Sequence, residues 1–332
     1  MSVFIIAEAG ANHNRNFKQA IALIDVAADA GADAVKFQTY SSDTLYSKNT
    51  PNFAGYRDIN KLIKNIELPR EWQKDLKQYC DKRDIEFMST PFDERAIEEL
   101  CELGVRRLKI AGFDSSDPRF VRAVAKSGLP LIITAGIGSN VRSVENIISW
   151  VKEVNARSDI TILHGNNAYP TPFSDATLNQ IDQFVVAFPD VKVGLSDHTH
   201  GILAPPLAVA KGAKVIEKHF TLSRRLPGPD HPFAIEPHEL KQMVVNIRLA
   251  EQMCISKVES FSKSEQEMKF AMRSCVTKTS LRKGEPLTQE NLTTKRPYLC
   301  DSIPALEFYN ILGKKVLRDV EEDTILTLED VK

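Results

Sequence analysis

Eight short, apolar and β-branched runs alternate with longer segments of helical periodicity through residues 1–255 of this chain. The runs cover residues 3–8, 34–39, 86–91, 107–112, 131–136, 161–166, 192–198 and 215–221. Amphipathic segments at 17–30, 141–154 and 237–253 have the period of surface helices. Eight consecutive strand–helix units predict an α/β fold of the (β/α)8 TIM-barrel type.

A doubly wound open sheet is the structural alternative. Such a sheet rarely needs eight consecutive units, and no GxGxxG signature follows a strand here. Residues 256–270, rich in Ser, Lys and Glu, interrupt the pattern and are predicted to form a linker. Residues 271–332 carry short β-prone pieces such as 274–279 and 315–317, which predict a small, mostly β domain.

Charge and cysteine content exclude several classes of protein. Lys and Arg total 43 against 44 Asp and Glu, so no basic field favours nucleic acid or a membrane surface. Five scattered cysteines without CxxC pairs predict neither a zinc cluster nor a disulfide framework. The first residues lack the order of a signal peptide, and no apolar run approaches the roughly 18 residues of a membrane span. We therefore expect a cytoplasmic protein.

The predicted strands end in unusually polar residues. In a TIM barrel the active site forms at this end of the strands. The residues at or just after the strand ends are Glu8, Lys36, Gln38, Thr90, Lys109, Asp114, Thr134, His164, Asn166, Asn167, Ser196, His198, Glu217 and His219. Residues two apart on a strand lie on the same face, so the side chains of Lys36 and Gln38, for example, should point the same way. A lysine inside an apolar strand needs an anion or carboxylate, and two such lysines with hydroxyl and amide donors predict an anion pocket.

His198 and His219 end successive predicted strands. Neighbouring strands lie about 5 Å apart, so two imidazoles at their ends can bind one metal ion. The alternative is a pair of hydrogen-bonded histidines without metal. His164 either orients the following loop or binds a ligand, and His13 either lines the site or turns the chain. The Gly-rich stretch 134–139 is either a phosphate-binding loop or a plain turn. The Pro-rich loop 224–232 either holds Asp230 over the barrel mouth or is an ordinary rigid loop.

Several motifs then occur in a fixed order along the chain. They are Ile6-Ala7-Glu8-Ala9-Gly10, Lys36-Phe37-Gln38, Ser89-Thr90-Pro91-Phe92, Tyr169-Pro170-Thr171-Pro172, Ser196-Asp197-His198-Thr199, Glu217-Lys218-His219-Phe220-Thr221 and Gly228-Pro229-Asp230-His231. With them the whole chain resembles the sialic acid synthase family, which condenses phosphoenolpyruvate with amino sugars to make N-acetylneuraminate, legionaminate or pseudaminate. Residues 271–332, with Thr294-Lys295-Arg296-Pro297, resemble the antifreeze-like (SAF) domain of that family.

The resemblance implies a role for each matching residue. Phosphoenolpyruvate would be held by Lys36, Thr90, Lys109, Thr134, Asn167, Tyr169 and Ser196, and the amino sugar by Gln38, Asp230 and Arg296. Glu8 and Asp114 would be the acid–base or water-orienting carboxylates. His198 and His219 would bind Mn²⁺ or Mg²⁺ and count with them as catalytic. The family also implies a domain-swapped homodimer in which Arg296 reaches the partner's barrel.

Departures from the family pattern leave the sugar open between N-acetylmannosamine and a 2,4-diacetamido-6-deoxyhexose. Phe113, together with residues 38–43 and 203–205, resembles pseudaminate synthases, whereas Asn167-Ala168-Tyr169-Pro170 resembles the sialate and legionaminate side. Two other functions remain as alternatives. One is an enzyme making 3-deoxy sugar acid phosphates, which would need Arg224 and Arg225 for a second phosphate. The other is a non-catalytic carbohydrate-binding protein.

Overall fold

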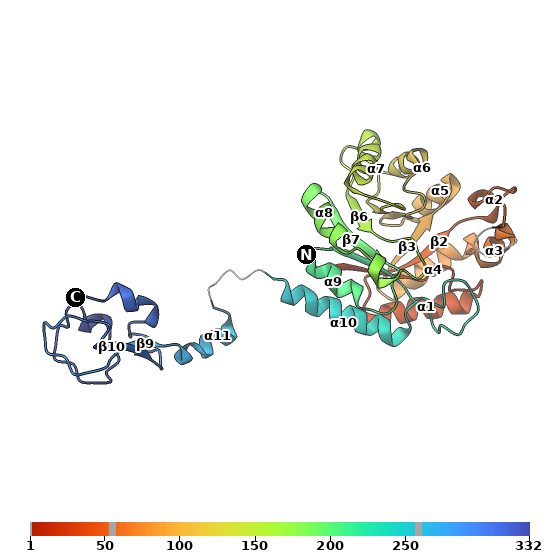
Figure 1. Cartoon of the computed structure of the whole chain (residues 1–332). Coiled ribbons are helices and arrows are strands. Elements are labelled where there is room, and N and C mark those ends of the chain that lie inside the picture. The colour runs from red at the N-terminus through yellow and green to blue at the C-terminus, as the bar shows by residue number, and fades with distance from the viewer. Residues whose placement is uncertain (1, 53–57, 256–260) are drawn as a thin grey trace. The chain divides into compact units, whose positions relative to one another are not determined.

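The computed structural model describes residues 2–52, 58–255 and 261–332 of the chain. These residues form two compact units, Met1–Ile255 and Ser256–Lys332 (Figure 1). None of the helices in the described part of the chain combines the length and apolar character needed to cross a membrane.

The first unit contains the eight predicted strands in the predicted order. They are β1 (Phe4–Glu8), β2 (Ala34–Thr39), β3 (Glu86–Pro91), β4 (Leu108–Ile110), β5 (Leu131–Thr134), β6 (Ile160–His164), β7 (Lys192–Asp197) and β8 (Val215–His219). The helices between and after them are α1 (Phe17–Ala30), α2 (Ser42–Leu45), α3 (Ile59–Ile66), α4 (Gln73–Lys82), α5 (Glu94–Leu103), α6 (Pro118–Ala125), α7 (Val141–Val154), α8 (Asn179–Ala187), α9 (Ala204–Ala210) and α10 (Pro237–Met253).

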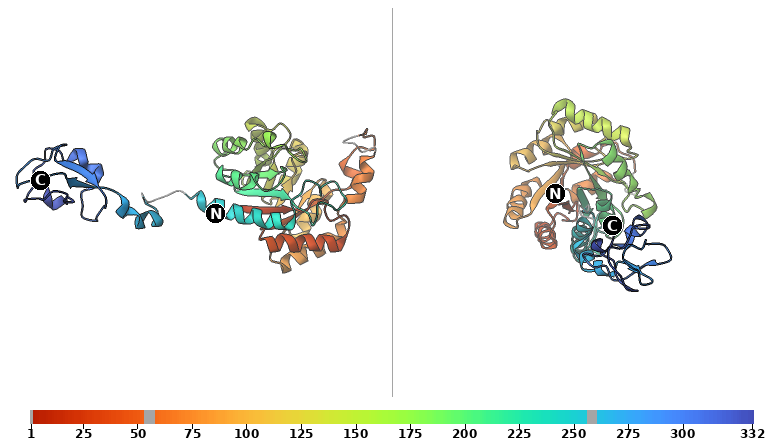
Figure 2. Two further views of the ribbon diagram at one scale, coloured as in Figure 1. Left: turned by 60° about the horizontal axis from the view of Figure 1, so that its bottom comes forward. Right: turned by 90° about the vertical axis from the view of Figure 1, so that its left-hand side faces the viewer.

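The strands form one parallel sheet that curls into a barrel. Pairing runs from β4 through β5, β6, β7, β8, β1 and β2 to β3, and β3 in turn lies against β4. Figure 2 shows the resulting ring of strands surrounded by helices. This arrangement confirms the predicted (β/α)8 barrel and excludes the open doubly wound sheet.

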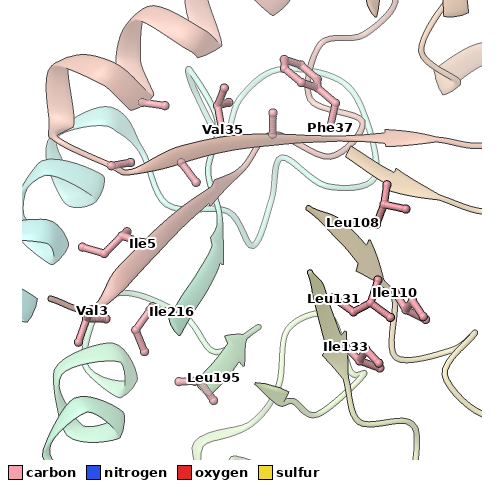
Figure 3. Packing of buried hydrophobic residues seen from close by; sticks show 14 of the residues in the cluster. Val3, Ile5, Val35, Phe37, Leu108, Ile110, Leu131, Ile133, Leu195 and Ile216 are labelled. Carbon is pink, nitrogen blue, oxygen red and sulfur yellow. The ribbon is translucent and has the colours of Figure 1, made fainter. Parts of the chain in front are cut away.

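Alternation along each strand divides the first unit into an outer and an inner core. Ile5, Val35, Phe37 and Ile216 belong to the outer core, which fills the space between strands and helices, and Figure 3 shows these side chains projecting from the strands. The inner core occupies the N-terminal part of the barrel interior and consists of Phe4, Ile6, Ala34, Met88, Ile132, Leu163 and Val215. Towards the C-terminal strand ends the inward positions become polar. The apolar plug thus forms the floor of a polar cavity.

Local signals determine where the helices of the barrel begin and end. The side chain of Asn16 accepts a hydrogen bond from the Gln19 N–H at the start of α1, and that of Asp93 accepts one from Ala96 at the start of α5. Gly31 ends α1 with φ of 81°, in the left-handed region that glycine adopts without steric cost. Such short caps return the chain to the next strand within a few residues.

The second unit is mostly irregular β structure around its own small core. Strands β9 (Ser274–Thr277) and β10 (Leu292–Lys295) pair antiparallel, and isolated bridges such as Pro286↔Lys315 and Val316↔Val331 replace a continuous strand at 315–317. Cys275, Leu281, Leu287, Leu292, Ile303, Ile311, Val316, Val320 and Leu326 form the core. Within the predicted linker, residues 256–260 lie outside the described residues, and α11 (Lys263–Glu267) is a short helix followed by the 3-10 turn η3 (Lys269–Ala271). The other 3-10 turns are η1 (Arg70–Trp72), η2 (Phe173–Asp175), η4 (Ala305–Asn310) and η5 (Leu328–Asp330).

Candidate active site

One cavity at the C-terminal strand ends gathers most of the residues singled out from the sequence. The strand register places these residues at the same height in the barrel. Glu8 on β1 lies beside Lys36 on β2 and His219 on β8, and Ser196 on β7 lies beside Glu217 on β8. The cavity is lined by Glu8, Lys36, Gln38, Thr90, Phe92, Lys109, Ala111, Gly112, Thr134, Asn167, Tyr169, Ser196, His198, Glu217 and His219. All seven residues assigned to phosphoenolpyruvate lie in this lining.

Three predicted site residues lie outside that lining. Asp114 follows β4 on the turn into α6 and is separated by one residue from Gly112, which lines the cavity. The carboxylate of Asp230 accepts the Ala11 N–H at 3.0 Å, and it lies so close to Gly10 that a Cβ there would be 2.6 Å from Oδ2. That virtual Cβ would also be 3.3 Å from His219, so Asp230 and His219 flank the same glycine. Arg296 is an exposed residue of the second unit.

Two lysines and two glutamates form a buried charge network in the cavity. The Lys36 ammonium forms an ion pair with Glu8 at 2.6 Å and donates to the Thr90 hydroxyl at 3.0 Å. The Lys109 ammonium donates to Glu217 at 3.2 Å, and Lys36 lies 3.8 Å from the same oxygen. All four side chains are at most 5% exposed. Because the glutamates offset the charge of the lysines, the buried barrel interior can hold both lysines ready for an anion.

The two glutamates of the network have pKa values shifted in opposite directions. Burial raises the pKa of Glu8 to about 7 from an ordinary 4.5, although Lys36 opposes this shift. Burial also acts on Glu217, but the attraction of Lys109 and Lys36 outweighs it and lowers that pKa to about 2. Burial likewise raises the pKa of Asp114 to about 6, helped by the charge of Asp117. Near neutral pH, Glu8 and Asp114 can therefore each gain or lose a proton, while Glu217 stays ionised.

Buried polar atoms without partners mark the cavity as a ligand site. They include Thr134 Oγ1, Asn167 Nδ2 and Glu217 Oε2. An unsatisfied buried polar group costs on the order of 1–3 kcal/mol, so a fold that keeps several together has them positioned for a bound molecule. Asn167 reaches this place because Gly112 has no side chain, since a Cβ there would lie 2.7 Å from Asn167 Oδ1.

His198 and His219 face the cavity with ring centroids 5.6 Å apart. The carbonyl of Asn166 accepts a 2.6 Å hydrogen bond from His198 Nδ1, which fixes the proton there and leaves Nε2 with a free lone pair. Burial lowers the pKa of His198 to about 4 and that of His219 well below its ordinary value, so both rings are neutral. His219 Nδ1 is buried without a partner. Two neutral imidazoles suit a divalent cation.

The described residues contain no group of three His, Cys, Asp and Glu side chains arranged to hold a metal ion. A cation bound by His198 and His219 would therefore take its remaining ligands from water and substrate. This open coordination is typical of a catalytic metal site and not of a structural one.

Two other histidines, His164 and His13, have structural partners. His164 faces away from the cavity, where its Nε2 donates to the Ala176 carbonyl at 2.8 Å and its ring packs edge-on against Phe184. His13 is buried beside Phe37 and Trp72, and its Nδ1 accepts the Arg15 N–H at 3.0 Å. These contacts support the structural reading of both residues.

Glu217 is the residue of the network to which sequence reasoning gave no role. The position of Glu217 two residues before His219 predicts that its side chain faces inward, and a buried Lys109 is expected to need a carboxylate. What the sequence did not provide was the approach of β8 to Lys109, 108 positions earlier in the chain. The structure adds Glu217 to the candidate site as the carboxylate that Lys109 and the Ser196 hydroxyl share.

Replacing Glu217 with glutamine is expected to lower the free energy of unfolding at neutral pH by about 3–5 kcal/mol, because Lys109 and Lys36 lose a buried counter-charge. The depressed pKa makes the stabilisation by Glu217 complete above pH 4.5 and removes it as the pH falls towards 2. Urea denaturation checks both points. Glu153→Gln, at a surface pair with Arg122, should change stability by less than about 0.5 kcal/mol. Equal effects of the two substitutions would refute a buried network.

Comparison with known proteins identifies the family. Residues 23–259 match the NeuB family and residues 273–332 the SAF domain. The chain belongs to the NeuB family. An uncharacterized protein of Methanocaldococcus jannaschii is 40% identical, with 99% of this chain and 94% of the relative covered. The N,N'-diacetyllegionaminic acid synthase of Campylobacter jejuni is 36% identical, with 97% and 98% covered.

A solved structure agrees with this NeuB-family assignment. The N-acetylneuraminic acid synthetase of Leptospira borgpetersenii, in complex with citrate, is 35% identical with a TM-score of 0.74. The comparison covers 81% of this chain and 91% of that one. The family resemblance drawn from the motifs is thereby confirmed.

Proposed function

We propose that this NeuB-family protein condenses phosphoenolpyruvate with an N-acetylated amino sugar and water, giving a nine-carbon sialic-type acid and phosphate. The buried pair of lysines beside unpartnered hydroxyl and amide groups supports this most strongly, because it matches a small, multiply charged acid. The names of the relatives, synthases of N-acetylneuraminic and diacetyllegionaminic acid, agree with this reaction.

Lys36 and Lys109 offset the carboxylate and phosphate charge of phosphoenolpyruvate in this proposal. Thr90, Thr134, Asn167, Tyr169 and Ser196 complete its binding site. As C3 attacks the open-chain sugar aldehyde, positive charge develops at C2, and water adds there before the tetrahedral intermediate expels phosphate. Glu8, with a pKa near neutrality, accepts the proton of the attacking water, and a second water molecule protonates the new alkoxide. Asp114, ionised above its pKa of about 6, orients the attacking water.

The remaining predicted residues hold the sugar and a divalent cation. Gln38 lines the cavity and Asp230 lies beside His219, so both side chains can contact the sugar. Mn²⁺ or Mg²⁺ bound by His198 and His219 would supply Lewis-acid polarisation of the aldehyde oxygen. The five cysteines are free, which supports a reducing, cytoplasmic setting. The reaction is tested by phosphate release that requires both substrates.

The two alternatives receive no support from the site. A second phosphate would need free cations at the cavity, yet Arg224 pairs with Glu239 at 2.6 Å, and neither Arg224 nor Arg225 lines the cavity. A non-catalytic binding protein would have no use for two buried carboxyls with raised pKa values of about 7 and 6, one in the cavity lining and one on the turn beside it.

We further propose a domain-swapped homodimer in which Arg296 serves the barrel of the second copy. A His198→Ala chain and an Arg296→Ala chain should each be inactive alone. Random mixing should restore about a quarter of wild-type activity, because half of the dimers then hold one intact site out of two. Mass spectrometry of the intact complexes checks that mixed dimers form. Mixed dimers without activity would contradict the swap.

A further inference from the structure

A buried ion pair lies on the outer face of the two strands that carry the candidate metal-binding histidines. Asp197 on β7 is paired in register with Lys218 on β8. The Lys218 ammonium lies 2.6 Å from the Asp197 carboxylate, and both side chains are at most 2% exposed. They share the outward strand faces with Leu195 and Ile216, which belong to the outer core (Figure 3). The pair therefore lies in an apolar layer, where an isolated charge is costly to bury.

Lys218 also holds the chain on the far side of His198. Its ammonium donates a second hydrogen bond to the Thr199 carbonyl, and the Thr199 N–H in turn donates to the Asp197 carboxylate at 2.9 Å. One ammonium thus binds the residue before His198 and the residue after it, from a position next to His219 in the chain. We call Asp197, Lys218 and Thr199 the strand clamp.

The strand clamp determines how far apart the two histidines lie. Successive side chains on a strand point to opposite faces, so His198 and His219 face the cavity while the clamp contacts lie behind them. The ring of His198 is oriented separately, by the Asn166 carbonyl that accepts from its Nδ1. A metal ligand must hold its place to within about 0.5 Å, so a tie between the two strand ends bears directly on cation binding.

Stability alone does not account for a buried ion pair at this place. Replacing such a pair with apolar residues of similar volume is often neutral or stabilising. What the ion pair adds is direction, because the ammonium donates to a particular carboxylate and a particular carbonyl. We propose that Lys218, through the strand clamp, holds His198 and His219 at the separation that a divalent cation needs. Asp197 and Lys218 are thus positioning residues. This inference rests on the metal binding proposed for the two histidines and extends it to residues outside the cavity.

Mn²⁺ binding to the full chain without substrates tests the inference, because this measurement does not depend on the condensation reaction. Electron paramagnetic resonance of the unbound ion gives the Kd. Lys218→Met should raise the Kd about 10–100-fold, the usual effect of losing a group that orients a metal ligand. Lys218→Arg keeps the charge and the donors and should keep most of the affinity.

A double variant separates positioning from stability. Lys218→Met leaves the Asp197 carboxylate buried without a counter-charge. Asp197→Asn in the same chain removes that charge and keeps an acceptor for the Thr199 N–H. The double variant should therefore unfold at a higher urea concentration than Lys218→Met, yet its Kd for Mn²⁺ should stay raised. A Kd that returns to the wild-type value together with stability would show that the pair is merely structural, and the inference would fail.

Lys211→Met is the matched control. The Lys211 ammonium also lies 2.6 Å from a carboxylate, that of Asp182, but this pair joins α8 to the end of α9 and its side chains are 30% and 48% exposed. The substitution should leave the Kd for Mn²⁺ unchanged. A folded Lys218→Met chain that binds Mn²⁺ as tightly as the wild type would overturn the inference alone. A wild-type chain that binds no Mn²⁺ would overturn the proposed metal site and the inference with it.

Discussion

Replacing Lys109 with methionine is expected to lower kcat/KM for phosphoenolpyruvate by about 10²–10³-fold, the usual effect of removing one charged group from a dry site. The Lys109 ammonium is buried at the centre of the cavity, 3.2 Å from Glu217, and burial lowers its pKa. Methionine keeps the length of the side chain and removes its charge. Initial rates of phosphate release at saturating sugar measure the effect.

Lys77→Met is the matched control for that experiment. Lys77 lies on the outside of the barrel in α4 and pairs with Asp81, so the same substitution should leave kcat/KM within about twofold of wild type. Lys109→Arg retains the charge and should recover part of the activity, which separates loss of charge from loss of structure. A folded Lys109→Met protein with nearly wild-type kcat/KM would show that Lys109 does not bind the anion.

Replacing Glu8 with glutamine is expected to lower kcat by about 10²–10⁴-fold, the range for loss of a general base. Burial raises the pKa of Glu8 to about 7, so its carboxyl is protonated below that pH and ionised above it. Because the base acts as a carboxylate, wild-type kcat/KM should rise as the pH increases through 7. The variant should lack this rise. Rates measured from about pH 5 to about pH 9 test both points.

Glu86→Gln is the control for the pH profile. Glu86 lies at the opposite, N-terminal end of the barrel, where Arg107 donates to it at 2.8 Å, so its replacement should preserve the rise at pH 7. A Glu8→Gln protein that keeps the rise would assign that titration to another group. Asp114, whose pKa is about 6, would then be the first to examine.

The predictable part of the fold was that encoded in local periodicity. All eight strands and the bounds of α1, α7 and α10 follow from the spacing of apolar residues. Helices α2 and α3 were not predicted, because they lie in an insertion between β2 and α4 whose small core of Tyr40, Ile59 and Ile63 is separate from the barrel. In the second unit, residues 315–317 pair only through bridges, which local β propensity does not distinguish from a strand.

The gathering of polar residues at one end of the barrel could be predicted from the sequence, but their electrostatics could not. Two-residue alternation placed Lys36, Ser196 and His198 on inward faces, and the structure brings them together. The sharing of Glu217 by Lys109 and Ser196, and the raised pKa of Glu8, depend on distances across the barrel and on desolvation. Neither quantity can be read from a linear sequence.

The most direct test of the account is Mn²⁺-dependent phosphate release from phosphoenolpyruvate, with N-acetylmannosamine and 2,4-diacetamido-6-deoxyhexoses offered side by side and the products weighed by mass spectrometry. We predict release that requires an N-acetylated sugar, and a product with the mass of the sugar plus a three-carbon acid unit. Removal of the cation with a chelator should abolish the release. If none of these sugars causes phosphate release, the proposed function is contradicted.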